Sequence, residues 1–144
     1  MNSRPLNLLL VEEDRVDSKI IKVALSKAGI QGDLYMVTSG RECIRFLRKQ
    51  SEYSAAPTPD VIIVDLNLLR AGTGQLNDLK AHTDTAGIPV IILADDHVEK
   101  EILAPYIGGT VRSVNPPSRI GEFIASIRKV IFDLLPEVVG AIRD

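Results

Sequence analysis

The chain has 144 residues, of which 45% are hydrophobic and 25% are charged, and this composition predicts one globular domain with a hydrophobic core. Its formal net charge of −2 at pH 7 gives no general attraction to nucleic acid or to an anionic membrane. No apolar run approaches the roughly 20 residues of a membrane span, and no signal peptide is recognisable, so we expect a cytoplasmic protein.

Short apolar runs alternate with longer segments of helical period along the chain. The run LNLLLV at 6–11 predicts a strand. The next segment has a 3.6-residue period and predicts a helix that ends at Gly29. One stripe of this helix is expected to face the core, and it consists of Val16, Ile20, Ala24 and Ala28.

A second strand and helix follow directly. Residues 33–37 predict the strand, and Ser39 with Glu42 has the spacing of a capping box that opens a helix over 40–50. The single cysteine, Cys43, lies on the apolar side of this helix, so we expect a buried and unreactive thiol.

Three more strands are predicted in the rest of the chain. The run DVIIVDLN at 60–67 is rich in β-branched residues, which predicts a strand buried on both faces of a parallel sheet. A glycine-containing loop leads to a short helix with Leu76 and Leu79, and strands at 88–93 and 110–114 follow, each with a helix after it. The helix after 88–93 is expected around Val98, Ile102, Leu103 and Tyr106, and the helix from Ile120 to Leu134 has the clearest period. Strands and helices thus alternate five times, which predicts an α/β fold with helices on both faces of a parallel sheet.

Polar residues follow the carboxyl ends of these strands, where the working site of such a fold lies. They are Glu12, Glu13 and Asp14 after the first strand, Asp65 and Asn67 at the third, Asp95 and Asp96 at the fourth, and Asn115 at the fifth. Clustered carboxylates attract a hard cation such as Mg²⁺, and Asp65, held at the end of a hydrophobic strand, suits a nucleophile toward a phosphoryl donor. Helix capping, which we expect of Asp14, is the plain alternative for the cluster.

Four segments resemble, in their order and spacing, the receiver domain of two-component response regulators: LLLVEEDRVDSKII, PDVIIVDLNLLRAGTG, IPVIIL and NPP. Within that family the segment SGRECIRFLRKQSEYSAAPTPDVIIVDLNL and the tail FDLLPEVVGAI most resemble the stand-alone regulators of phytochrome histidine kinases. The resemblance implies a flavodoxin-like, doubly wound fold of three layers with a five-stranded parallel sheet in the order 2-1-3-4-5. It also implies a receiver domain over 1–135 and a helical extension over 136–144.

The same resemblance assigns roles to the residues at the strand ends. It makes Asp65 the phosphoacceptor. It implies a Mg²⁺ site formed by Glu13, Asp65 and the backbone carbonyl of Asn67, with Glu12 as the neighbouring acid. It further implies a cis peptide bond before Pro116, which would direct residue 115 across the rim.

Two positions depart from the family pattern. Ala94 stands where the family has a Ser or Thr hydroxyl that meets the phosphoryl group, and Asn115 stands where the family has a lysine. Alanine cannot donate a hydrogen bond, and asparagine carries no charge. Glu13, in place of aspartate, weakens the fit to the strict octahedral geometry of Mg²⁺. Arg70 or Arg112 could replace the lost cation, but no pattern in the sequence places either there.

The departures favour an atypical receiver that is not an enzyme and that acts mainly through protein–protein interaction with a sensor histidine kinase. The alternative is a phosphorylation-competent receiver that accepts a phosphoryl group at Asp65. A small enzyme or nucleotide-binding protein is a third reading, which neither a glycine-rich phosphate loop nor a nucleophile–base pair supports. We expect no nucleic acid or membrane partner, and we expect a homodimer formed by the fourth helix, the fifth strand, the fifth helix and the apolar tail 136–144.

Overall fold

Five parallel strands form a single sheet in the order β2-β1-β3-β4-β5. The computed structural model describes residues 5–68, 78–82, 87–94, 101, 104–108 and 110–136. The strands are β1 (Leu6–Val11), β2 (Gly32–Val37), β3 (Val61–Asp65), β4 (Val90–Leu93) and β5 (Val111–Val114). The helices are α1 (Arg15–Lys27), α2 (Gly40–Leu47) and α5 (Ile120–Leu134), with 3-10 turns at Ser51–Tyr53, Leu66–Leu68 and Ala104–Tyr106. The predicted doubly wound α/β fold and its strand order are confirmed.

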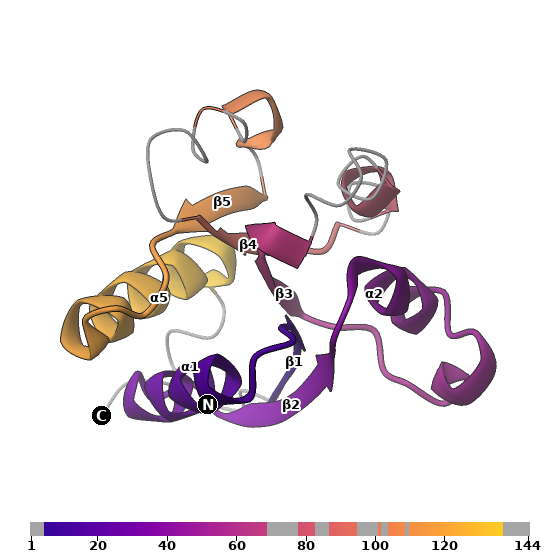
Figure 1. The fold of residues 1–144 in the computed structure, drawn as a ribbon, viewed down its shortest axis with the longest axis horizontal. Coiled ribbons are helices and arrows are strands. Elements are labelled where there is room, and N and C mark those ends of the chain that lie inside the picture. Colours follow the sequence, from indigo (N-terminus) through magenta and orange to yellow (C-terminus); the bar gives the residue numbers. More distant parts are fainter. Residues whose placement is uncertain are drawn as a thin grey trace.

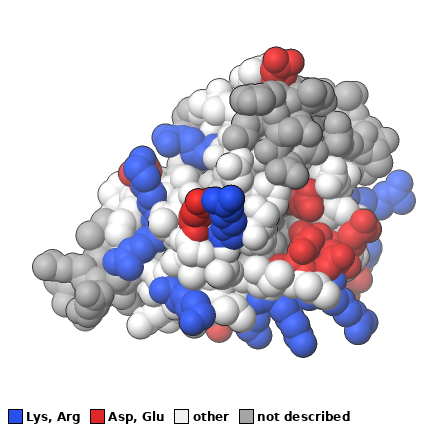
Figure 2. Space-filling view, turned by 60° about the vertical axis from the view of Figure 1, so that its left-hand side comes forward, with Lys and Arg blue, Asp and Glu red and all other residues white. Residues whose placement is uncertain are grey.

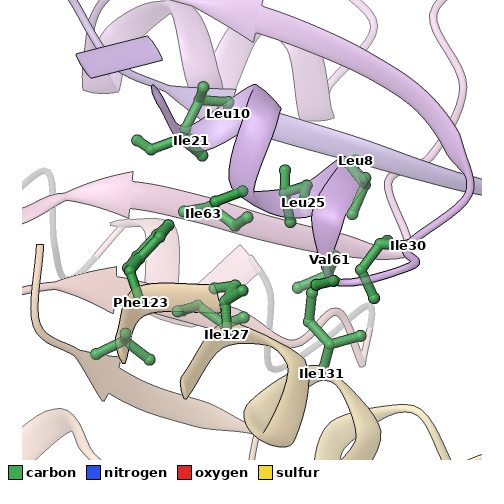
Figure 3. Packing of buried hydrophobic residues seen from close by; sticks show 14 of the residues in the cluster. Leu8, Leu10, Ile21, Leu25, Ile30, Val61, Ile63, Phe123, Ile127 and Ile131 are labelled. Atoms are coloured by element: carbon green, nitrogen blue, oxygen red, sulfur yellow. The ribbon is translucent and has the colours of Figure 1, made fainter. Parts of the chain in front are cut away.

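The helices cover both faces of the sheet, with α1 and α5 on one side and α2 on the other (Figure 1). Successive strand residues point to opposite faces, so each strand contributes to two cores. Leu8 and Leu10 of β1 pack with α1 and α5, whereas Leu9 packs with α2. Figure 3 shows residues of α5, including Ile127, converging with α1 and β3 in the first of these cores.

The helix starts are set by side-chain caps, as the sequence predicts. The Asp14 carboxylate accepts a hydrogen bond from the Asp17 N–H at 2.9 Å, and the Ser39 hydroxyl accepts one from the Glu42 N–H at 3.1 Å. The capping box at α2 is altered, because the Glu42 carboxylate accepts from the Thr38 hydroxyl at 2.6 Å rather than from Ser39. Each cap satisfies an otherwise unpaired N–H of the first helical turn.

Three predicted elements are longer than the observed ones, and one of them is the strand expected over 88–93, which begins only at Val90. The helix expected over 40–50 ends at Leu47, because Lys49 has a φ of 55° and leaves the helical region. The strand expected over 60–67 ends at Asp65 and continues as the turn Leu66–Leu68.

The Cys43 thiol is buried as expected, and burial raises its pKa to about 12, so it is unreactive.

The first helix turns part of its apolar stripe to solvent. Ala24 and Ala28 are buried as predicted, but Val16 is 66% exposed and Ile20 is only half-buried. The residues beside the stripe, Ile21 and Leu25, fill the core instead. The reason is that α5 and the sheet cover one side of α1 and leave its outer edge open.

Several expectations fall on residues outside the described ranges. They are Arg70, Leu76 of the short helix after the third strand, the acids Asp95 and Asp96, Val98, Ile102 and Leu103 of the helix after the fourth strand, and the tail beyond Pro136. Among the residues that are described, no helix is both long and apolar enough to cross a lipid bilayer.

Candidate functional site

Two carboxylates, those of Glu12 and Asp65, lie next to each other at the ends of the neighbouring strands β1 and β3. Val11 of β1 pairs with Val64 of β3, so the residues that follow them, Glu12 and Asp65, stand side by side at the rim. Asp65 also pairs with Leu93 of β4. Both acids continue the alternation of strand residues that pack toward α1 and α5, so their side chains start from the same face of the sheet.

Glu12 is the buried acid of the first loop. Its side chain is only 4% exposed, and its carboxylate accepts a hydrogen bond from the Asp14 N–H at 3.2 Å. The pKa of Glu12 is raised to about 7, chiefly by burial; the Asp14 N–H opposes the shift, and the negative charges of Asp65 and Asp17 contribute to it. Protonated and ionised forms of this carboxyl therefore coexist near neutral pH.

Asp17 is an acid of the site to which the sequence reading gave no role. It lies in the first turn of α1, where burial raises its pKa and the charges of Asp14 and Asp65 add to the shift. The position of Asp17 could have been predicted from the sequence, because it comes three residues after the cap Asp14 and so lies in the helical turn that faces the rim.

Asp65 is held by the turn that follows it. Its side chain is half-buried, and its Oδ1 accepts a hydrogen bond from the Asn67 N–H at 2.9 Å. This contact orients the carboxylate at the rim, as a phosphoacceptor requires. That Asn67 also offers its carbonyl to a metal stays a prediction.

The structure does not bring all of the predicted metal ligands together at the rim. Glu13 is exposed to solvent, whereas its neighbour Glu12 is the acid that lies against Asp65. Within the described ranges, no three His, Cys, Asp or Glu side chains converge as metal ligands. Carboxylates and a backbone carbonyl are the donors that Mg²⁺ prefers, so the residue types at the rim fit such an ion. The described side chains are not arranged around a common point where the ion would bind.

The two unusual positions lie at the ends of β4 and β5. The Ala94 N–H donates to the Val114 carbonyl at 3.0 Å, so the ladder between the two strands extends to this residue. Ala94 is fully buried in the core on the α2 side, and Asn115 is exposed. The ends of β4 and β5 are therefore followed by a buried methyl group and an exposed, uncharged amide, at the positions where the resemblance implies a hydroxyl and an ammonium.

The peptide bond before Pro116 is trans, so the expected cis bond is wrong. A trans X–Pro bond is intrinsically favoured by about 0.5–1 kcal/mol. In the described part of the chain no hydrogen bond ties Asn115 to the rim and offsets that preference.

The candidate replacement cation Arg112 lies below the rim. It pairs with Ile91, which is two residues before the end of β4 at Leu93. On the face drawn in Figure 2, acidic side chains gather in one cluster, whereas the Lys and Arg side chains are scattered. The strand register therefore does not place Arg112 at the level of the rim acids.

The chain is similar to known response regulators in sequence and in structure, although no family model matches it. It is 34% identical over 103 residues to the response regulator Rcp1 of Synechocystis sp., which is 71% of this chain and 70% of Rcp1. The phosphorylated cyanobacterial phytochrome response regulator RcpA superposes with a TM-score of 0.75 at 24% identity, covering 93% of this chain and 96% of RcpA. The Mn²⁺-bound form of Rcp1 superposes with a TM-score of 0.71 at 27% identity, covering 89% of this chain and 93% of Rcp1. The chain belongs to the response regulators and has the fold of their receiver domain.

Proposed function

We propose that the chain is a single-domain response regulator of a phytochrome-type two-component system that acts mainly through protein–protein interaction and has no enzymatic activity. One observation carries this proposal: Asp65 is kept and oriented, while buried Ala94 and exposed Asn115 replace the groups that would contact a phosphoryl oxygen. A phosphoryl group on Asp65 would find neither a hydroxyl nor an ammonium there, so it would not pull β4 and β5 into a second state.

The partner would be a sensor histidine kinase, because the similar proteins Rcp1 and RcpA are response regulators. RcpA is the response regulator of a cyanobacterial phytochrome. An apolar surface beside the rim supports such a partner. Val16, Val23 and Ile120 are 66%, 48% and 44% exposed. A hollow of about 440 Å³ lies at Val23 and Ile120, and its lining consists of Lys19, Ile20, Val23, Pro117, Ser118 and Ile120.

The apolar surface has the geometry of a helix contact. Val16, Ile20 and Val23 follow one edge of α1 at spacings of four and three residues, and Ile120 begins α5 beside them. Val16 shares the first turn of α1 with Asp17, so a kinase helix bound here would lie next to the acidic rim. Exposed apolar patches of this kind mark interaction sites.

A divalent ion such as Mg²⁺ would be held by Asp65, the acids of the first loop and the Asn67 carbonyl. The ion would offset the repulsion among the carboxylates. Glu13 is exposed and longer by one methylene than aspartate, so this binding is expected to be weak.

We also propose a homodimer that uses the fourth helix, β5, α5 and the tail 136–144. The position of β5 at the edge of the sheet supports it, as does Ile107, which is 38% exposed next to the bridge from Gly108 to Val111. Sedimentation of the full chain and of a chain lacking 136–144 tests this: a dimer that survives the deletion, or a monomer at high concentration, contradicts it.

The second candidate function is a working phosphoreceiver, which the hydrogen bond from the Asn67 N–H to Asp65 favours. Titration calorimetry with the dimerisation and phosphotransfer domain of a phytochrome histidine kinase separates the two. We expect Asp65→Asn to leave the affinity unchanged and Val16→Ser with Val23→Ser to weaken it by about tenfold. The phosphoreceiver is supported instead if phosphorylation of Asp65 changes the affinity for the kinase domain and the two valine substitutions do not.

A further inference from the structure

A basic hollow lies on α2, on the opposite side of the sheet from the apolar surface of α1 and α5. Its volume is about 330 Å³. Its lining consists of Gly40, Arg41, Ile44, Arg45, Arg48, Gln50 and Asp78. The lining includes three arginines and one aspartate, and Glu52 pairs with one of the arginines, Arg45, so the hollow keeps one net positive charge in a chain whose formal net charge is −2.

The central arginine is fixed by a network of side chains. The Arg45 guanidinium pairs with the Glu52 carboxylate at 2.6 Å and lies 5.8 Å from the centre of the Tyr53 ring. The Tyr53 hydroxyl donates to Glu42 at 3.0 Å, and its ring packs against Phe46 with centroids 5.3 Å apart. The wall of the hollow is therefore built before any ligand arrives.

The two outer arginines have unused hydrogen-bonding capacity. Arg41 and Arg48 are exposed, and neither forms an ion pair with any other described residue. They are seven residues apart, which is about 10 Å, or two turns, along the helix. A guanidinium presents a planar fork of N–H donors that matches a carboxylate, so two forks at this spacing fit two carboxylates of one polypeptide segment.

The lining favours a protein segment over a nucleic acid. Binding to a nucleic acid backbone depends on many cations that neutralise successive phosphates. The hollow instead combines two arginines that no described residue pairs with, Asp78 and the apolar side chain of Ile44. An acidic peptide with an apolar residue between its carboxylates matches this mixture.

We propose that this α2 hollow is a docking site for an acidic segment of a second protein partner. The site does not depend on the kinase contact proposed above, because α2 and the pair α1 and α5 cover opposite faces of the sheet (Figure 1). The regulator could then bind a kinase on one face and an acidic partner on the other at the same time. Such a chain connects two proteins without any change at Asp65.

The test is a titration of the ¹⁵N-labelled full chain, followed by NMR and by fluorescence anisotropy. The probe is a labelled helical peptide with two glutamates two turns apart and a leucine between them, and the control peptide has lysines in place of the glutamates. We expect shifts at α2 with the acidic peptide and an affinity about tenfold weaker for Arg41→Ala with Arg48→Ala. Lys27→Ala with Lys129→Ala removes the same charge away from the hollow and is expected to bind normally.

Three results would overturn the proposal. The first is unchanged binding in the double arginine variant, with circular dichroism showing that it is folded. The second is no binding of the acidic peptide to the unmodified chain at millimolar concentration. The third is tighter binding of a single-stranded oligonucleotide of equal charge, which would make the hollow a general polyanion site.

Discussion

Glu12 and Asp65 stand level at the ends of β1 and β3, and the charge of Asp65 contributes to the raised pKa of Glu12. The acid that follows, Glu13, is the one that family resemblance assigns to the metal, yet it is exposed. The rim thus holds a buried carboxyl that titrates near neutrality next to the residue that would accept a phosphoryl group. A cation bound at the rim and a proton on Glu12 relieve the same repulsion, so they are expected to compete.

The first prediction concerns the pH dependence of stability. Because the pKa of Glu12 rises from 4.5 to about 7 on folding, the folded chain binds more protons than the unfolded chain between these values. Stability should therefore fall as the pH rises through this window, by on the order of 2 kcal/mol. Glu12→Gln keeps an acceptor for the Asp14 N–H but cannot ionise, so it should remove most of this fall.

Urea unfolding at about pH 5 and about pH 8, with a chelator present, measures the difference. Glu13→Gln is the matched control, since this side chain is exposed. Parallel losses of stability in the unmodified chain and in Glu12→Gln would refute the assignment to Glu12.

The second prediction restores the groups that the family has at the strand ends. Ala94→Thr with Asn115→Lys supplies a hydroxyl and an ammonium at the rim, so phosphorylated Asp65 should persist longer than in the unmodified chain. Intact-mass measurements after incubation with acetyl phosphate and Mg²⁺ follow the yield and its decay. Asp65→Asn in the same background controls for labelling elsewhere, and an unchanged lifetime would show that these two positions do not limit the chemistry.

The third prediction tests the close contact between β1 and β2. A Cβ added at Gly32 would lie 2.0 Å from the Leu6 carbonyl oxygen, so Gly32→Ala should force the strands apart and destabilise the fold by about 2 kcal/mol or more. Gly121→Ala is the control, because nothing lies within 4 Å of its added Cβ in α5, and it should stabilise by about 0.5 kcal/mol. Thermal unfolding of both variants decides the point; equal melting temperatures would contradict it.

The fourth prediction separates the core of α5 from the exposed edge of α1. Ile127 is fully buried between the sheet and α1, so Ile127→Ala should cost about 2–5 kcal/mol of unfolding free energy. Val16→Ser should change it by less than about 0.5 kcal/mol, because the side chain is 66% exposed. A large loss from Val16→Ser in denaturant titrations would mean that Val16 is covered in solution, for instance by a second copy.

The sequence predicted the sheet well because buried parallel strands are continuous apolar runs bounded by polar residues, as in VIIV before Asp65. It also predicted the caps Asp14 and Ser39, which depend only on local hydrogen bonds. It could not say which edge of α1 is covered, because periodicity defines an apolar face but not the neighbour that packs on it. Val16 fits the helical period and is nevertheless exposed.

The same limit applies at the rim. Glu12 continues the alternation of Leu8 and Leu10, so its burial could have been predicted from the two-residue period of β1. The isomer of the bond before Pro116 could not be predicted from the sequence, because the intrinsic preference between cis and trans is small.

We propose that Asp65 remains an acceptor while the strands that would report its phosphorylation no longer respond. The most direct test is the ¹⁵N spectrum of the full chain with and without beryllofluoride and Mg²⁺. We expect shifts confined to the turn at Asp65 and the first loop, with β4 and β5 unchanged. Saturable shifts that spread through Ala94 and Val111–Val114 would contradict it.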